Sequence, residues 1–360
     1  MRDNENIIAL ELREANIPIP KETADKKGFV VFGENNDYPN FLFDGYSECS
    51  ILQSIINGLT DYVCGSGFED ATAENRTINR NGETYAELVK KVVADYLIFG
   101  AFSLQVIRNK AGKVIELYWI DTRRVRLDED EKYVYYRREW TKYSRDMKKY
   151  DRWQRDMNFD NCIYYYKRPV ARGTYGLPMW SSVVKDVQTA IEISKFHLSS
   201  ILNNFAASAF INFNNGVPTK EEQKDIEKRI NEKFSGSTNA ARMMLSFNNN
   251  KEQAVTVERI QEDNFDQKYA ALAKSVKENI FVAFRAQPQL FGTDPDRTGF
   301  NSQEYSESFK LFKKTVVAPI QTEIETAFAR IDPNFAFKLK EFNIDFDPVT
   351  PQTNENPTNI

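Results

Sequence analysis

The chain has 360 residues, of which 41% are hydrophobic and 13% aromatic, enough for a large core in two domains or in one elongated subunit. Its 48 Lys and Arg side chains nearly balance 52 Asp and Glu, and the formal net charge of -4 argues against tight binding of nucleic acid or of a membrane surface through bulk charge. No apolar run approaches the roughly 20 residues that a membrane-spanning helix needs.

Residues 1–178 indicate a mixture of helices and antiparallel strands. Apolar residues recur every three to four positions from Ser47 or Ser50 to Gly65 and again from Thr84 to Phe99, which predicts two helices. The aromatic segment 37–46 is expected to pack on the core. Strands are predicted at 29–32, 103–108, 114–120, 125–127, 133–137 and 162–167, with a hairpin turn at 109–112. Residues 140–155, rich in charged and aromatic side chains, suggest an exposed insertion.

Long helices dominate the rest of the chain. They are predicted at 179–206, at about 263–284 and at 303–331, and Pro319 predicts a kink in the third because it removes the hydrogen bond to the Thr315 carbonyl. Between the first two lie predicted strands at 209–213, 243–247 and 254–260, and a helix that runs from the capping box Thr219–Glu222 to Phe234. A Pro- and Gly-rich segment follows at 286–302, a strand-like run at 335–346 and a tail, expected to be disordered, at 347–360.

No motif for catalysis or metal binding is complete. Asp294–Gly299 begins like a calcium loop, but the twelfth position is Tyr305 instead of the required Glu, which favours a turn. Cys64–Gly67 ends a predicted helix, which favours a helix stop over a phosphate loop. The three cysteines are scattered and suit a reducing cytoplasm, and the single histidine, His197, lies within a predicted helix. We therefore expect no catalytic residue, no metal site and no cofactor.

Charged clusters in the first half have two interpretations. The pairs Arg123-Arg124, Arg137-Arg138 and Lys148-Lys149, interleaved with Tyr and Trp, could form a basic patch, although solvated sheet edges are the interpretation that we favour. Acidic neighbours such as Asp61 and Glu69 are common in a chain with 52 carboxylates, and nothing marks one pair as general acid and base.

From Tyr175 onward the order of elements resembles that of tailed-phage portal proteins. Tyr175-Gly-Leu-Pro178 matches a Gly-x-Pro turn before the first stem helix, and Phe210–Pro218 matches an Asn-rich strand that ends in Gly-x-Pro. Phe284–Gly292 resembles the close of the second stem helix, and Asn301 and Pro319 match a loop asparagine and a mid-helix proline. Residues 37–120 are also similar to the family's wing, with its Gly-x-Gly-Phe stop at 65–68.

The resemblance implies an α+β fold, an elongated portal-type subunit with long stem helices, a small αβ clip insert and a mixed α/β wing. The implied parts are a wing at 1–178, stem helices at 179–208 and 263–286, a clip at 209–262, a tunnel loop at 287–302, a kinked wing helix and strand at 303–346, and a tail or crown remnant at 347–360. Few residues follow the kinked helix, so the helical crown of larger members is expected to be absent or vestigial.

The same resemblance implies a homo-oligomeric ring, usually a dodecamer, assembled in the host cytoplasm and located at one capsid vertex of the virion. The ring would be the channel for DNA packaging and ejection. The implied partners are double-stranded DNA (bound weakly and without sequence preference), the terminase large subunit, the major capsid or scaffolding protein, and head–tail connector or adaptor proteins, with no membrane.

Site residues follow from the implied parts. The expected DNA contacts in the tunnel loop are Arg297, Thr298, Phe300 and Asn301, and the expected terminase-facing residues of the clip are Glu221, Lys224, Asp225, Lys228 and Arg229. Two alternatives stay open. One is a carboxylate- or metal-dependent enzyme, which predicts a divalent-ion site and turnover by a monomer. The other is a different phage assembly protein without a DNA channel.

Overall fold

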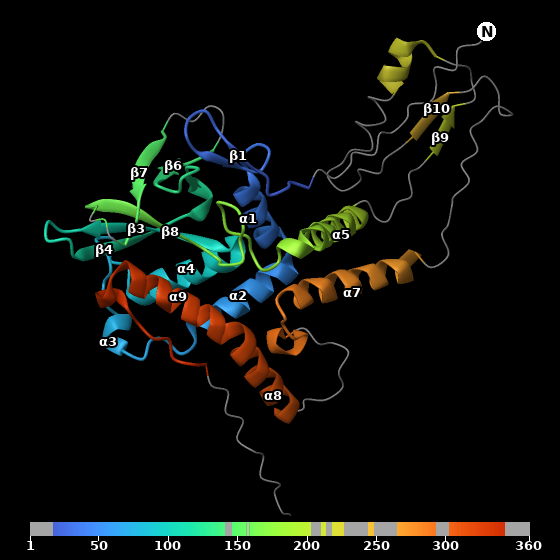
Figure 1. Ribbon diagram of the computed structural model, residues 1–360. Helices are drawn as coiled ribbons and strands as arrows, with labels where there is room; N and C mark the ends of the chain where they lie inside the picture. Colours follow the sequence, from blue (N-terminus) through green and yellow to red (C-terminus); the bar gives the residue numbers. More distant parts are fainter. Residues whose placement is uncertain are drawn as a thin grey trace, which may run out of the picture. The chain divides into compact units, whose positions relative to one another are not determined.

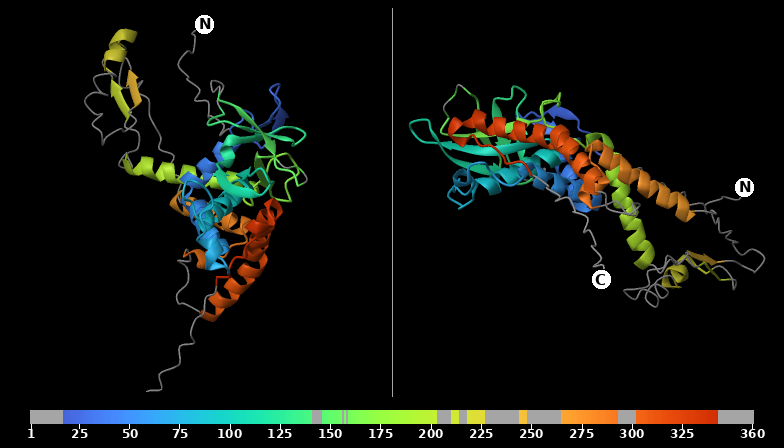
Figure 2. Two further views of the ribbon diagram at one scale, coloured as in Figure 1. Left: turned by 90° about the vertical axis from the view of Figure 1, so that its left-hand side faces the viewer. Right: turned by 90° about the horizontal axis from the view of Figure 1, so that it is seen from below.

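The chain folds into two units, shown in Figure 1 and from two further sides in Figure 2. One unit comprises Met1–Lys185 with Ile280–Ile360, and the other comprises Asp186–Asn279. The computed structural model describes residues 17–140, 146–155, 157, 159–202, 210–213, 218–226, 244–247, 265–292 and 302–342.

A six-stranded sheet in the order β4-β3-β8-β7-β6-β5 forms one layer of the first unit. Its strands are β3 (Ala101–Arg108), β4 (Val114–Ile120), β5 (Val125–Leu127), β6 (Tyr133–Tyr136), β7 (Lys148–Arg152) and β8 (Asn161–Lys167). The predicted hairpin is confirmed: β3 and β4 pair antiparallel, and the Asn109 side chain accepts 3.0 Å hydrogen bonds from the main-chain N–H groups of Ala111 and Lys113. The other predicted antiparallel strands of this sheet are confirmed as β5, β6 and β8.

The prediction of an exposed insertion at 140–155 is only partly correct: Lys148 and Lys149 are exposed, but the segment is also part of the sheet. This segment contains β7, which pairs antiparallel with β6 and parallel with β8. The segment also contributes aromatic contacts, since the Trp140 ring lies 4.9 Å from Phe29 and the Trp153 ring lies 5.2 Å from Tyr164. The sequence does not reveal β7 because its residues are mostly charged and show no alternation of apolar side chains. Hydrogen bonds to β6 and β8 satisfy its backbone, so the strand forms without an apolar face.

Helices cover the sheet, with α4 against β3 and β4 and α2 against α4 and α9 (Figure 1). The helices are α1 (Tyr38–Glu48), α2 (Ser50–Cys64), α3 (Ala71–Glu74), α4 (Tyr85–Phe99), α8 (Ser302–Phe312) and α9 (Ala318–Ile331). The two predicted helices are confirmed as α2 and α4. Thr84 and Glu87 form a reciprocal capping box at the start of α4, and Gly100, with a φ of 68°, ends it.

The aromatic segment 37–46 packs on the core as expected, and it does so as α1, in which Leu42 is fully buried. A hairpin of β1 (Glu22–Ala24) and β2 (Val30–Phe32) precedes it, so the predicted strand at 29–32 is confirmed as β2. The C-terminal run that was predicted as a strand at 335–346 forms no continuous strand among its described residues. It is a 3-10 turn (Pro333–Phe335) followed by one bridge between Phe68 and Leu339, and residues 343–346 lie outside the described part.

The third predicted long helix is interrupted by a turn of π-helix. Residues Lys313–Val317 form this turn between α8 and α9. Pro319 lies in the first turn of α9, where a missing backbone N–H leaves no helical hydrogen bond broken within α9. The π-turn ends two residues before the proline, and π-turns are a recognised cause of helix kinks. The kink at Pro319 itself stays a prediction.

The second unit contains most of the two long helices α5 (Val184–Leu202) and α7 (Phe265–Ala283), which confirms both predictions. A short 3-10 turn (Ser181–Val183) precedes α5. Between the helices, β9 (Phe210–Phe213) and β10 (Met244–Phe247) form a parallel pair, with Phe210 opposite Met244. The predicted strand at 254–260 lies outside the described residues.

The capping box that was predicted in the second unit is present. Thr219 N donates to Glu222 Oε2 at 2.9 Å, and Glu222 N donates to Thr219 Oγ1 at 3.4 Å. Residues 220–226 are helical, and the predicted continuation to Phe234 lies outside the described residues.

Candidate functional site

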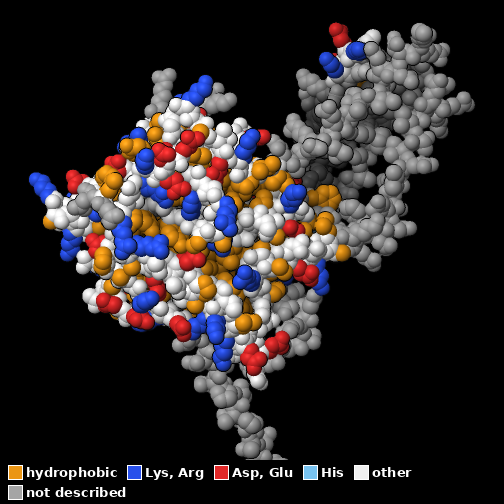
Figure 3. All heavy atoms as spheres, in the orientation of Figure 1, with side chains coloured by type: hydrophobic (Ala, Val, Ile, Leu, Met, Phe, Trp, Pro, Cys, Tyr) orange, Lys and Arg blue, Asp and Glu red, His pale blue; other side chains and the backbone are white. Residues whose placement is uncertain are grey.

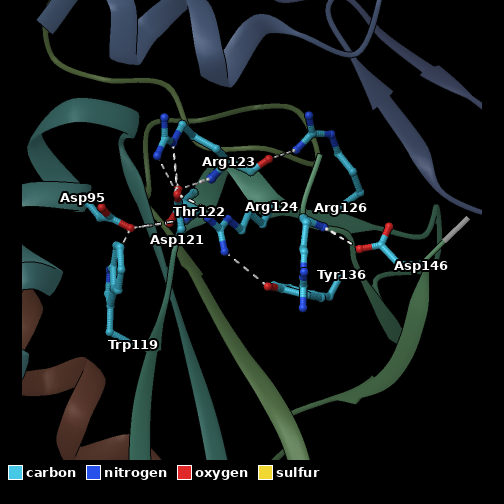
Figure 4. Close-up of polar contacts among 10 residues, drawn as sticks. Asp95, Trp119, Asp121, Thr122, Arg123, Arg124, Arg126, Tyr136 and Asp146 are labelled. Carbon is cyan, nitrogen blue, oxygen red and sulfur yellow. Dashed lines mark hydrogen bonds and ion pairs between the residues drawn. The ribbon is translucent and has the colours of Figure 1, made fainter. Parts of the chain in front are cut away.

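The main polar cluster of the first unit is built around the turn that joins β4 to β5 (Figure 4). Asp95 projects from α4 into this turn, where it accepts hydrogen bonds from Thr122 Oγ1 at 2.7 Å and from Trp119 Nε1 at 3.1 Å. Burial disfavours the charged carboxylate and raises the pKa of Asp95 to about 7, against the opposing effect of these hydrogen bonds. The cluster therefore contains a buried acid that titrates near neutral pH.

The residue before Thr122, Asp121, forms ion pairs with two arginines. Its Oδ2 lies 2.7 Å from Arg123 Nη2 and 3.7 Å from Arg124 Nε, and its Oδ1 accepts from the Arg123 main-chain N–H at 3.0 Å. The hydrogen bond to Asp121 raises the pKa of Arg123. The Arg123 guanidinium also lies 4.0 Å from the centre of the Phe43 ring, which fixes it against α1. Both oxygens of Asp121 are thereby engaged.

Arg126 is buried beside this turn without a carboxylate among its hydrogen-bond partners. It is 1% exposed, and its guanidinium donates to the Asn36 carbonyl at 2.7 Å, to the Val125 carbonyl at 2.7 Å and to the Arg123 carbonyl at 3.0 Å. Burial lowers its pKa to about 10. The side chain stays charged at neutral pH and contributes positive charge to the interior.

A hollow of about 870 Å³ opens above this cluster. One side, the basic wall, is formed by Arg123 and Arg124 of the turn after β4 and by Arg137 and Arg138 after β6. Trp140 contributes an aromatic surface. The residues that line it are Asp25, Lys27, Phe29, Val31, Glu34, Asn35, Asn36, Asp37, Asn40, Asp121, Arg123, Arg124, Arg137, Arg138, Glu139 and Trp140. The hollow thus brings together the two arginine pairs that flank the hairpin of β5 and β6.

This geometry partly corrects the interpretation of the basic pairs as solvated sheet edges. Arg124 and Arg138 are exposed, as that interpretation requires, but Arg137 is only 7% exposed. Lys149 lies on β7 over the ring of Tyr133, at 3.4 Å from its centre, and does not line the hollow. On the face shown in Figure 3, basic and acidic side chains of the first unit are interspersed, so that face has no large region of one sign.

Sequence reasoning could not identify most of this cluster. The Asp-Thr-Arg-Arg turn has a local capping signal at Asp121, but no signal links Asn36 to Arg126 across 90 positions. The burial of Asp95 could be inferred only from its position on the apolar face of α4. The tertiary fold, not a motif, assembles the site.

The predicted clip and tunnel-loop residues are described only in part. Glu221, Lys224 and Asp225 are exposed on the helical residues 220–226. Lys228 and Arg229 of the clip lie outside the described residues, as do Arg297, Thr298, Phe300 and Asn301 of the tunnel loop. The described start of that loop is a 3-10 turn (Pro288–Phe291) closed by Gly292, whose φ is 71°.

The long helices carry exposed apolar side chains in the second unit. Leu198 on α5 is 58% exposed and Leu272 on α7 is 46% exposed. Large apolar side chains on well-formed helices are candidates for contact with another molecule.

Within the described ranges, no three His, Cys, Asp or Glu side chains are grouped so that they could hold a metal ion. Cys49 and Cys162 are buried, and burial raises the pKa of the Cys162 thiol to about 11, which leaves it protonated at neutral pH. His197 is exposed on α5. Among these same residues, no helix combines the length and apolar character of a membrane span.

Comparison with known proteins gives one family and a consistent set of folds. Residues 76–347 match the sequence profile of the family described as phage portal protein. No curated protein matches the chain significantly.

The similar solved structures are parts of phage-like particles. A chain of the virion of a native gene transfer agent particle has a TM-score of 0.54 at 18% identity, covering 91% of this chain and 86% of that one. A chain of the native particle's neck, with C12 symmetry, has a TM-score of 0.53 at 18% identity, covering 89% and 85%. An HK97 family phage portal protein from Corynebacterium diphtheriae has a TM-score of 0.51 at 14% identity, covering 83% and 94%. At such identities the likeness establishes a shared α+β fold.

Proposed function

Because the chain belongs to the phage portal protein family, we propose that it forms a closed ring at one capsid vertex and that this ring is the channel for DNA packaging and ejection. The family match over residues 76–347 carries the proposal. Members of the family are structural assembly proteins, in agreement with the expectation that the chain is not an enzyme.

The ring is proposed to be a homo-oligomer, usually of twelve subunits in the family. The similar neck structures of gene transfer agent particles have C12 and C6 symmetry, which supports a cyclic assembly for this chain. The exposed Leu198 and Leu272 also support it, because a neighbouring subunit would remove these apolar side chains from water.

The tunnel loop, residues 287–302, is proposed to meet the DNA through Arg297, Thr298, Phe300 and Asn301. The second long helix ends at Ala283, and the described start of the loop is the 3-10 turn Pro288–Phe291 followed by the left-handed Gly292, so the helix does not continue into this segment. The net charge of -4 for the chain fits a channel along which DNA slides, since few phosphates would be held tightly.

The clip, residues 209–262, is proposed to dock the terminase large subunit during packaging and head–tail connectors afterwards. The parallel pair of β9 and β10 supports this assignment, because it joins the two sides of the insert into one αβ element. The exposed charges of Glu221, Lys224 and Asp225 provide a polar surface for such contacts. The wing would contact the major capsid or scaffolding protein.

Negative-stain imaging of the purified full-length protein tests the proposal. We expect closed rings with a central opening wide enough for a DNA duplex. Monomers that turn over a substrate with added divalent ions would favour the enzyme alternative, and assemblies without a central opening would favour an assembly protein that has no DNA channel.

A further inference from the structure

The glycine in the interior of α2 has a specific neighbour. Gly58 lies between Ser50 and Cys64, where glycine is less favourable than alanine because folding restricts its freer backbone. A Cβ on Gly58 would lie only 2.8 Å and 2.9 Å from Cδ1 and Cε1 of the Phe291 ring. An alanine at position 58 therefore cannot coexist with the ring in its present place, and glycine leaves the space that the ring occupies.

Other aromatic rings hold the Phe291 ring against α2. Its centre lies 5.7 Å from that of Tyr62, 6.0 Å from that of Phe281 and 5.9 Å from that of Phe312. All three contacts are edge-on, an arrangement that stabilises aromatic pairs beyond the area that they bury. Phe281 is 3% exposed and Phe312 is 2% exposed, so neither can move aside without opening the core.

Two hydrogen bonds attach the 3-10 turn that contains Phe291 to two helices. Tyr62 Oη, on α2, donates to the Leu290 carbonyl at 2.7 Å. Gln289 Nε2 donates at 2.9 Å to Ser308 Oγ, on α8. Leu290 is itself 5% exposed, so the turn also packs into the core. The described start of the segment 287–302 is therefore attached to both α2 and α8.

We propose that Phe291 is a positioning residue for the segment 287–302: its ring, in the space left by Gly58, determines where the chain leaves the 3-10 turn. A displacement of α2 or α8 then displaces the turn as well, because the ring and the two hydrogen bonds join them. All of these contacts lie within the first unit. The consequence for DNA rests on the proposed function, since it requires that the residues after Gly292 meet the duplex.

Hydrogen–deuterium exchange of the full-length protein without DNA, measured by mass spectrometry, tests the positioning. The amides of Leu290 and Gly292 report on the turn, because both donate hydrogen bonds within it. Gly58→Ala and Phe291→Leu should each accelerate exchange of these amides by about tenfold and leave that of β3 and β8 unchanged. Ser54→Ala, a substitution on the exposed face of α2, is the matched control and should change neither.

A double substitution separates this contact from a general loss of stability. Phe291→Leu keeps an apolar side chain but lacks the rigid ring, so Gly58→Ala in that variant gains helix propensity without crowding. Gly58→Ala should therefore lower the melting temperature of the unmodified protein and raise that of the Phe291→Leu variant, in each case by about 2 °C. All four proteins are compared at one concentration, because assembly also changes the melting temperature.

Two results would overturn the proposal. A higher melting temperature of Gly58→Ala alone would show that the ring moves aside without cost. Unchanged exchange of the turn in Phe291→Leu would show that the ring does not position it, and this result stands even if Gly58→Ala fails to fold. Neither measurement contains DNA, so both results would leave the portal assignment in place. Rapid exchange together with normal packaging by Gly58→Ala rings would support the positioning and count against DNA contact by the segment.

Discussion

Asp95 on α4 accepts a 2.7 Å hydrogen bond from the hydroxyl of Thr122, in the turn between β4 and β5. The same carboxylate oxygen accepts from Trp119 Nε1 at 3.1 Å, so one buried acid joins α4 to β4 and to the turn that follows it. The residues after Thr122 line the arginine-rich hollow. The position of the hollow's basic wall therefore depends on a group that titrates near neutral pH.

Asp95→Asn should alter how stability depends on pH. The pKa of Asp95 is about 7 in the folded protein, against about 3.9 in an unfolded chain. Between these values the native state binds the extra proton, so the stability contribution is present below about pH 4 and is lost as the pH rises towards 7. The variant lacks this titration. The free energy of unfolding of the variant, measured relative to that of the unmodified protein, should therefore be higher at pH 7.5 than at pH 5.0 by about 2 kcal/mol.

Urea unfolding at the two pH values, at one protein concentration, measures this difference. Asp130→Asn is the matched control, because Asp130 has an exposed side chain and pairs with the exposed Lys132. An equal effect of Asp95→Asn at both pH values would contradict the assigned titration.

Gly100→Ala should be strongly destabilising. Gly100 has a φ of 68°, and a Cβ at this position would lie 2.1 Å from the Leu177 carbonyl oxygen. The clash is with backbone and cannot be relieved by a side-chain rotation, so we expect a loss above about 2 kcal/mol. It would also disturb the Leu177-Pro178 turn that leads towards α5.

Gly82→Ala separates conformational strain from the clash. Gly82 has a φ of 78°, and nothing lies within 4 Å of an added Cβ. Only the cost of a left-handed conformation remains, about 1 kcal/mol. Thermal or urea unfolding should rank Gly100→Ala well below Gly82→Ala in stability, and equal losses would show that the close approach to Leu177 is unimportant.

Local signals in the sequence were sufficient for most elements of the fold. The capping box at Thr84, the turn at Asn109 and the apolar stripes of α5 and α7 act within a few residues, so they can be recognised without knowing the tertiary structure. The strand β7 was missed because its charged residues have no apolar alternation, and only its neighbours β6 and β8 define it.

The candidate site was less predictable than the fold. The basic pairs were recognisable from composition, but the burial of Arg137 depends on Trp140 and on the packing around the hollow. The contact of Arg126 with Asn36 joins β5 to the turn before α1 and has no local signature. The π-turn before Pro319 was also missed, because Phe312, Val316 and Ile320 keep a four-residue spacing that an α-helix shows as well.

Replacing residues 216–252 by a short Gly/Ser linker should abolish DNA packaging and leave a folded first unit. This replacement removes Glu221, Lys224 and Asp225 together with β10, so the proposed docking surface for terminase is lost. Thermal unfolding and imaging check the folded state, and a packaging assay checks the function. Persistent packaging would show that the clip is assigned to the wrong segment.

Arg297→Glu should leave ring assembly intact and reduce packaging or retention of DNA. The substitution replaces a cation by an anion in the proposed tunnel loop, and one arginine contributes about one counterion to the salt dependence of DNA binding. The loss of affinity for DNA should therefore be small in each subunit, but every subunit of the ring carries the substitution. Arg330→Glu, an exposed substitution on α9, is the matched control. Normal packaging by intact Arg297→Glu rings would show that Arg297 does not contact the DNA.

Cryo-electron microscopy of DNA-filled particles, reconstructed without imposed symmetry, tests the central claim most directly. The account predicts a ring of this chain at a single vertex, with density for DNA passing through it and residues 287–302 facing that density. Particles in which the chain is absent from the vertex, or forms no ring around the DNA, would contradict the assignment as the portal.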